Sequence, residues 1–143
     1  MPPGTLPGIG RFYRDILGAP AAMAGGAMQV LVASGQHLLF REAEAPPPPF
    51  DGHHIQLALV DFGGAHARLA ERGLVTREDS PHQYRFQQLV DPEDGRALFE
   101  VEHEIRSMTH PLFGRQLVNR NPAVTNGRFA PGHEALAWAM PPE

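Results

Sequence analysis

Hydrophobic and polar residues alternate along the first 45 residues with two periods, first that of a helix and then that of strands. Residues 11–20, RFYRDILGAP, carry an apolar stripe on a helical spacing, and Gly18 followed by Pro20 ends the helix. Residues 27–33 and 37–43 then alternate as two short strands with a turn at Ser34–Gly35. The pattern therefore predicts a helix whose buried side chains are Phe12, Tyr13, Ile16 and Leu17, followed by a hairpin.

A similar order of elements follows the tetraproline at residues 46–49. Residues 54–60 predict a strand, residues 64–73 predict a helix that ends at Gly73, and two further strands at 84–90 and 96–105 flank a turn at Asp91–Gly95. Both halves thus read as a helix followed by strands. The second half has, in addition, a strand before its helix.

The first half lacks an equivalent of that opening strand. When the glycines that end the two helices, Gly18 and Gly73, are aligned, the strand at 54–60 falls largely on residues 1–5. These residues read MPPGT, and proline and glycine are poor strand formers. An unpaired sheet edge favours pairing with another chain, so we expect a homodimer, with an exchanged or shared strand as one possibility.

Composition narrows the class of protein. A length of 143 residues is typical of one domain with a sizeable core, and no apolar run approaches the roughly 20 residues that cross a bilayer. The start has no signal-peptide pattern, so we expect a cytoplasmic protein. Without cysteine or lysine the chain has no thiolate or Schiff-base chemistry. A net charge of −4 gives no reason to expect nucleic acid or an anionic membrane as partner.

Three segments together resemble the vicinal oxygen chelate superfamily, which contains glyoxalases, bleomycin-resistance proteins and extradiol dioxygenases. They are FYRDILGAP, HIQLALVDFGGAHARLAERGL and DPEDGRALFEVE, and the resemblance covers residues 9–105 or so. It implies an α+β fold of paired βαβββ modules that form an open, cup-shaped mixed sheet around a metal or ligand. We expect one domain, with module one at about 9–45, a proline linker at 46–50, module two at about 53–105 and an irregular extension at 106–143.

The resemblance also implies a metal site made of histidines and carboxylates on strands that face the cup. His54 and Glu100 occupy the matching places in the second half, and such a nitrogen and oxygen set suits Fe, Mn, Zn or Ni. Strand parity predicts that Leu98, Glu100, Glu102 and Glu104 share the cup face, whereas Phe99, Val101 and His103 face the helices. The counterpart of Glu100 in the first half is Phe40, which is no ligand. Glu42 is then the third candidate.

Function follows from the resemblance and stays open among three alternatives. The first is a metal-dependent dioxygenase or lyase-like enzyme acting on a small substrate with vicinal oxygens, with His110 and Tyr84 as candidate catalytic residues. The second is a metal-free protein that sequesters an antibiotic or another small molecule between aromatic walls such as Tyr84 and Phe86. The third is a structural dimer without catalysis. For His54 and Glu100, the alternative to metal binding is the ordinary role of a polar strand residue exposed to solvent.

Overall fold

The computed structural model describes residues 1–45, 52–111 and 113. The chain divides into two compact units, Met1–His110 and Pro111–Glu143, and the account below concerns the first of them. The predicted proline linker at 46–50 lies outside the described residues, as does residue 114 onward in the predicted extension.

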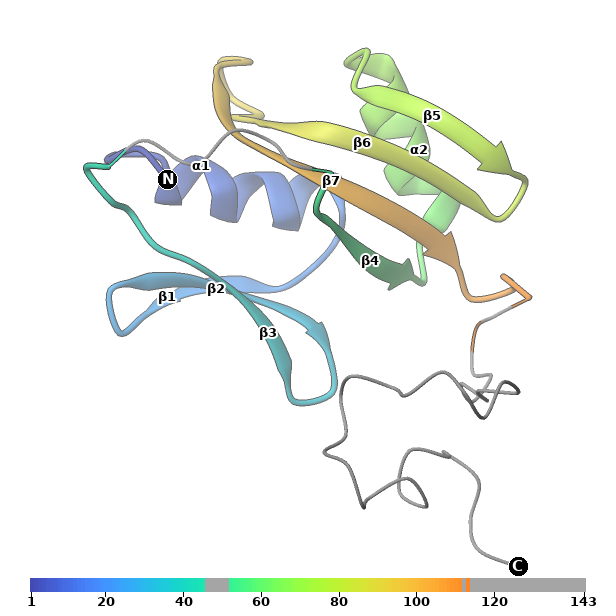
Figure 1. Cartoon of the computed structure of the whole chain (residues 1–143), viewed down its shortest axis with the longest axis horizontal. Helices are drawn as coiled ribbons and strands as arrows, with labels where there is room; N and C mark the ends of the chain where they lie inside the picture. Colours follow the sequence, from blue (N-terminus) through green and yellow to red (C-terminus); the bar gives the residue numbers. More distant parts are fainter. Residues whose placement is uncertain (46–51, 112, 114–143) are drawn as a thin grey trace, which may run out of the picture. The chain divides into compact units, whose positions relative to one another are not determined.

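The first module consists of a helix and a three-stranded antiparallel sheet (Figure 1). The helix begins at Leu6, five residues before the predicted start, and its second half is a π-helix. A third strand of small residues precedes the two that were predicted, and it pairs with the next strand across a Gly25–Gly26 turn. The elements are α1 (Leu6–Arg11), the π-helix η1 (Phe12–Ile16), β1 (Ala21–Ala24), β2 (Ala27–Ala33) and β3 (Gln36–Phe40).

The second module adds a strand before its helix and has a four-stranded mixed sheet of order β4-β7-β6-β5. The opening strand β4 runs parallel to β7, and the other neighbours are antiparallel. The elements are β4 (His54–Leu59), α2 (Phe62–Glu71), β5 (Val75–Ser80), β6 (Gln83–Val90) and β7 (Ala97–Ser107). This order confirms the predicted βαβββ module.

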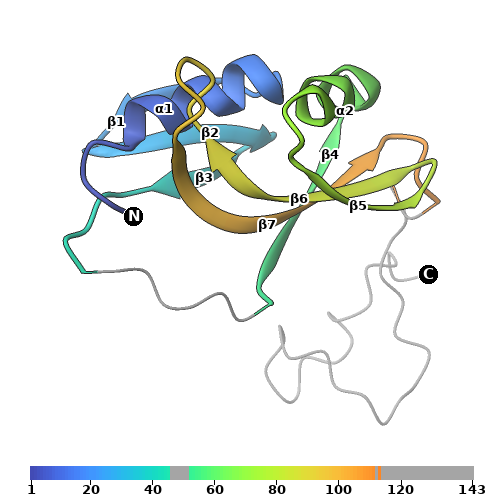
Figure 2. The ribbon, with the colours of Figure 1, turned by 90° about the horizontal axis from the view of Figure 1, so that it is seen from above.

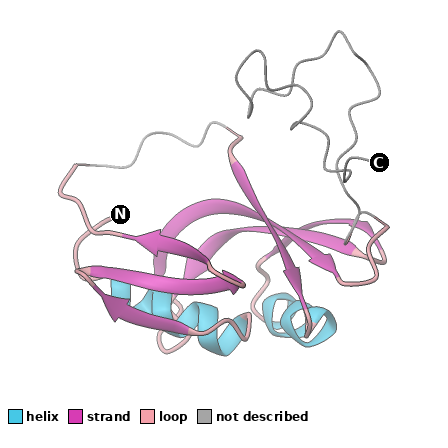
Figure 3. Cartoon of the chain, turned by 90° about the horizontal axis from the view of Figure 1, so that it is seen from below, coloured by secondary structure: helices cyan, strands magenta, loops and turns pink. Residues whose placement is uncertain are grey.

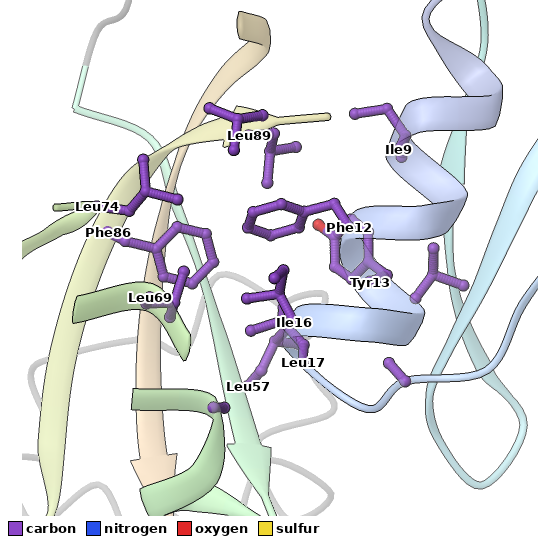
Figure 4. Packing of buried hydrophobic residues seen from close by; sticks show 14 of the residues in the cluster. Ile9, Phe12, Tyr13, Ile16, Leu17, Leu57, Leu69, Leu74, Phe86 and Leu89 are labelled. Carbon is purple, nitrogen blue, oxygen red and sulfur yellow. The ribbon is translucent and has the colours of Figure 1, made fainter. Parts of the chain in front are cut away.

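The helices of both modules lie on the same side of the strands, and none of the described helices covers the opposite side of the sheets (Figures 2 and 3). A single core fills the space between helices and strands. The four helix residues predicted to be buried, Phe12, Tyr13, Ile16 and Leu17, all belong to it (Figure 4). Side chains from η1, α2 and β6 meet there, and Phe12 packs on Phe86 with ring centroids 5.7 Å apart.

The first module has no opening strand in residues 1–45, as predicted. Two backbone hydrogen bonds join Met1 to the segment just beyond the end of β3. The Met1 amino group donates to the Arg41 carbonyl, and the Ala43 amide donates to the Met1 carbonyl. Within the described part of the chain, β3 therefore pairs with a strand only on its β2 side. The homodimer stays a prediction.

The helices of the described residues are all too short or too polar to span a membrane.

Candidate functional site on the open face

A set of polar side chains occupies the face of the second sheet that points away from the helices. On β6, Tyr84 and Phe86 are buried beneath the helices, so Arg85 between them points to the opposite side. Glu104 and Glu102 on β7 bond to Arg85 and therefore lie on that side too. We call this surface the open face, and it comprises His54, Arg85, Glu102, Glu104 and Arg106.

The open face is held together by a network of ion pairs. Arg85 contacts three carboxylates: its Nη1 donates to Glu102 Oε1 at 3.1 Å, its Nη2 pairs with Glu104, and its Nε lies 3.3 Å from Asp79 Oδ2. Hydrogen bonding to Glu102, together with these negative charges, raises the pKa of Arg85. Glu104 also pairs with Arg106 at 2.5 Å. Its side chain is only 4% exposed, and two arginines supply the compensation that a buried carboxylate needs.

His54 stands at the start of β4, beside this network. The parallel register places its backbone opposite Glu102, and its Nε2 lies 3.9 Å from Glu104 Oε2. The imidazole is 43% exposed, so it is accessible from the open side of the sheet. An imidazole and a carboxylate thus converge on the open face, and the carboxylate nearest to the imidazole is Glu104.

Glu100 lies further back along β7, where the strand is irregular. The register with β6 shifts between Phe86 and Gln88 and again between Leu89 and Val90. Glu100 lies opposite Gln88 and accepts a hydrogen bond of 2.5 Å from the Gln87 side chain. The predicted alternation holds for His103, which is buried under the helices, but is wrong for Leu98, which belongs to the core. The bulges break the parity on which that prediction depended.

The Glu42 side chain caps the start of the first helix. Its Oε1 accepts hydrogen bonds from the amides of Thr5 at 2.9 Å and Leu6 at 3.2 Å, where α1 begins and amides have no partner within the helix. Phe40 packs against Tyr13 with ring centroids 5.4 Å apart. The described residues contain no group of three histidine, aspartate or glutamate side chains that could hold a metal ion. His54 Nε2 lies 3.9 Å from Glu104 Oε2, and both Glu104 oxygens are paired with arginines, Oε2 with Arg85 and Oε1 with Arg106.

Of the two candidate catalytic residues, Tyr84 lies in the core and His110 lies just after β7. Tyr84 is buried in the core, its hydroxyl donates to the Phe62 carbonyl at 3.2 Å, and burial raises its pKa. The backbone amide of His110 donates to the Ser107 carbonyl just after β7. Catalytic roles for Tyr84 and His110, and metal binding by His54, Glu100 and Glu42, stay predictions.

Sequence reasoning missed Arg85 and Glu104 as parts of the site. The EVEHE run placed Glu104 on the predicted cup face, but only the parallel register of β4 and β7 brings it to His54. Arg85 stands between two buried aromatic residues on β6, and a single charged residue in an otherwise uncharged strand was the available signal.

Several solved structures have folds similar to that of this chain. A glyoxalase family protein from Bacillus anthracis has a TM-score of 0.50 and 17% identity, with 74% of this chain and 88% of that chain covered. The chain therefore has a glyoxalase-like fold. The structure named oxidase ChaP-H1 has a TM-score of 0.47 and 25% identity, with 71% of this chain and 86% of that chain covered.

A glyoxalase/bleomycin resistance protein/dioxygenase from Alicyclobacillus acidocaldarius has a TM-score of 0.43 and 16% identity, with 75% of this chain and 86% of that chain covered. No protein-family model matches the chain, and a search of curated proteins finds no significant match.

Proposed function

We propose that this protein is a metal-dependent small-molecule enzyme of the glyoxalase or dioxygenase type, with its reaction centre on the open face. The observation that carries the proposal is the approach of His54 Nε2 to Glu104 Oε2, 3.9 Å apart on neighbouring parallel strands. An imidazole and a carboxylate on one side of a sheet are donors that suit Fe, Mn, Zn or Ni. The proposal takes the remaining donors from outside the described residues of this chain.

The residues of the open face have separable roles in this proposal. His54 is the exposed donor, since its ring is reached from the open side. Arg85 and Arg106 hold the Glu104 carboxylate in one orientation, and they give the face positive groups beside which an anionic substrate oxygen is stabilised. A bound metal would supply Lewis-acid chemistry to a substrate with two adjacent oxygens, such as a catechol, hydroxy-ketone or diketone.

A second function is favoured by the same ion pairs. Because two arginines already neutralise Glu104, and because Glu42 accepts from the start of α1, both carboxylates have roles that need no metal. A metal-free protein that binds a small polar molecule on the open face, in the manner of bleomycin-resistance proteins, accounts for these contacts.

Metal content separates the two functions. Protein purified without added metal, and protein reconstituted in turn with Fe, Mn, Zn or Ni, is analysed for bound metal, together with His54→Ala, Glu104→Gln and Glu100→Gln. The enzyme proposal expects stoichiometric metal in the unmodified protein and its loss in His54→Ala and Glu104→Gln. Glu100→Gln keeps the metal if Glu104 is the carboxylate ligand, and loses it if Glu100 is.

Absence of stoichiometric metal under every reconstitution condition contradicts the metal-dependent proposal and favours the second function. Circular dichroism of each variant checks that the fold persists. Oxygen consumption with catechols, and product analysis with hydroxy-ketones and diketones, then distinguish a dioxygenase from a lyase or isomerase.

A further inference from the structure

A pocket lies in the second module at the start of α2, among residues of α2, β5 and β6. Its cavity has a volume of about 230 Å³, and its walls include Phe62, His66, Glu78, Ser80, Gln83 and Tyr84. None of the residues of the open face lines it. We propose that this pocket binds a small primary organic amine in its protonated form. This inference is independent of the function proposed for the open face.

Aromatic rings form one wall of the pocket. The rings of Phe62 and Tyr84 have centroids 4.8 Å apart and are tilted by 46°. The imidazole of His66 meets Tyr84 edge-on, with centroids 5.0 Å apart. Such rings offer an apolar surface to a hydrocarbon group, and their faces attract a cation.

The charged group of the pocket is a carboxylate. Glu78 Oε1 accepts a hydrogen bond of 2.8 Å from His66 Nε2, and its side chain is 64% exposed, so its second oxygen is open to solvent. With the proton on Nε2, the other ring nitrogen of His66 is an acceptor. In this neutral tautomer both groups present acceptors to a ligand, and Glu78 is the single carboxylate among the described lining residues.

Two side chains of the pocket donate to groups of the protein itself. The Tyr84 hydroxyl donates to the Phe62 carbonyl. The Gln83 side chain donates through Nε2 to Asp79 and accepts from Arg106 through its oxygen. The Ser80 hydroxyl oxygen accepts from the His82 amide, which leaves its O–H as a donor. A ligand with several N–H donors and a positive charge satisfies the acceptors of Glu78 and His66, whereas an anion is repelled by the Glu78 carboxylate.

Amide chemical shifts measured by NMR test the proposal with three probes of one shape, namely benzylammonium, neutral benzyl alcohol and anionic benzoate. We expect benzylammonium to give saturable shifts at Gly63, His66 and Ser80, with a dissociation constant on the order of millimolar because Glu78 is largely solvated. Benzyl alcohol should bind about tenfold more weakly, and benzoate should bind more weakly still.

Two matched variants locate the charge that matters. Glu78→Gln should weaken benzylammonium binding about tenfold, because it removes the carboxylate and keeps the shape. Glu71→Gln makes the same change at the end of α2, in an exposed pair with Arg72, and should leave binding unchanged. His54→Ala should also leave it unchanged, whatever its effect on metal content.

Four results would overturn the proposal. They are benzoate binding as tightly as benzylammonium, unchanged binding in Glu78→Gln, shifts that map to the open face, and the absence of any saturable shift with benzylammonium.

Discussion

The hydroxyl of Tyr13 and Nε2 of His103 form a hydrogen bond of 2.6 Å that joins the helix of the first module to the last strand of the second. Both side chains are fully buried. The other ring nitrogen of His103 donates to the Val101 carbonyl at 2.8 Å, so Nε2 is the acceptor and Tyr13 is the donor. The imidazole also stacks on Phe86 with centroids 4.4 Å apart. A fully satisfied polar pair thus fixes how η1 lies on β7.

Removing the Tyr13 hydroxyl tests how much this hydrogen bond contributes to the free energy of unfolding. In Tyr13→Phe, Nε2 of His103 stays buried without a donor, and an unsatisfied buried acceptor costs about 1–3 kcal/mol. The free energy of unfolding in urea at pH 7 should fall by that amount. Tyr84→Phe is the control, since its hydroxyl bonds a part-buried backbone carbonyl at 3.2 Å and should cost less. Equal losses in the two variants would contradict the special role of the Tyr13–His103 pair.

Burial of His103 predicts a dependence of stability on pH. Loss of solvation lowers the pKa of this imidazole to about 4, whereas its unfolded value is 6.5. Below pH 6.5 the unfolded chain binds the proton and the folded chain does not, so stability falls as the pH drops from 6.5 towards 4 and is constant above 6.5 as far as His103 is concerned. The loss should approach about 3 kcal/mol.

Unfolding in urea at pH 7.0, 5.5 and 4.5 measures this loss. His103→Gln keeps an acceptor for Tyr13 but has no titrating group, so its stability should decline less steeply over this interval. The same pH dependence in both proteins would show that other groups cause the decline.

Much of the helix and strand pattern could be predicted because it depends on local periodicity. The apolar stripe of Phe12, Tyr13, Ile16 and Leu17 identified the buried side of the first helix. The strand predicted at 27–33 matches β2 at both ends. β1 could not be predicted in this way, because Ala21–Ala24 has little strand preference of its own and becomes a strand through pairing with β2.

The parts of the site that were missed depend on contacts between distant residues. Strand parity placed Leu98 and Glu104 on one face, but the bulges in β7 place Leu98 in the core and leave Glu104 on the open face. The function of Glu42 depends on the folding of residues 5 and 6 against it, which no pattern around position 42 encodes. His54 was selected because it opens an apolar strand, and the structure places it at the start of β4; its role as a metal ligand stays a prediction.

Two variants of Glu42 test whether its side chain binds a metal or caps α1. If it caps α1, Glu42→Ala should lower the free energy of unfolding by about 1 kcal/mol, because the Thr5 and Leu6 amides lose their acceptor. Glu42→Gln keeps an acceptor oxygen and should cost less. Neither variant should change the metal content of the protein. Loss of metal in Glu42→Gln together with unchanged stability would instead identify Glu42 as a ligand.

Arg11 and Asp91 tie the first helix to the turn between β6 and β7, and their pairing gives a last prediction. Arg11 Nε donates to Asp91 Oδ1 at 3.0 Å and Nη2 donates to Oδ2 at 2.6 Å, and these bonds hold the pKa of the Asp91 carboxyl below its usual value. Asp91→Asn should therefore lower the urea midpoint at pH 7 more than Asp94→Asn, since Asp94 is exposed and lies 3.9 Å from Arg96.

The sign of the pH effect follows from the lowered pKa of Asp91. Its contribution is present above pH 3.8, the unfolded value, and is lost as the pH falls through the lower folded value. The difference in urea midpoint between the unmodified protein and Asp91→Asn should therefore be constant from pH 7 to 5 and shrink below pH 3.8. A difference that stays constant down to pH 2.5 would mean that Asp91 stabilises the fold by packing and neutral hydrogen bonds, because ionisation of its carboxyl would then contribute nothing to the pairing.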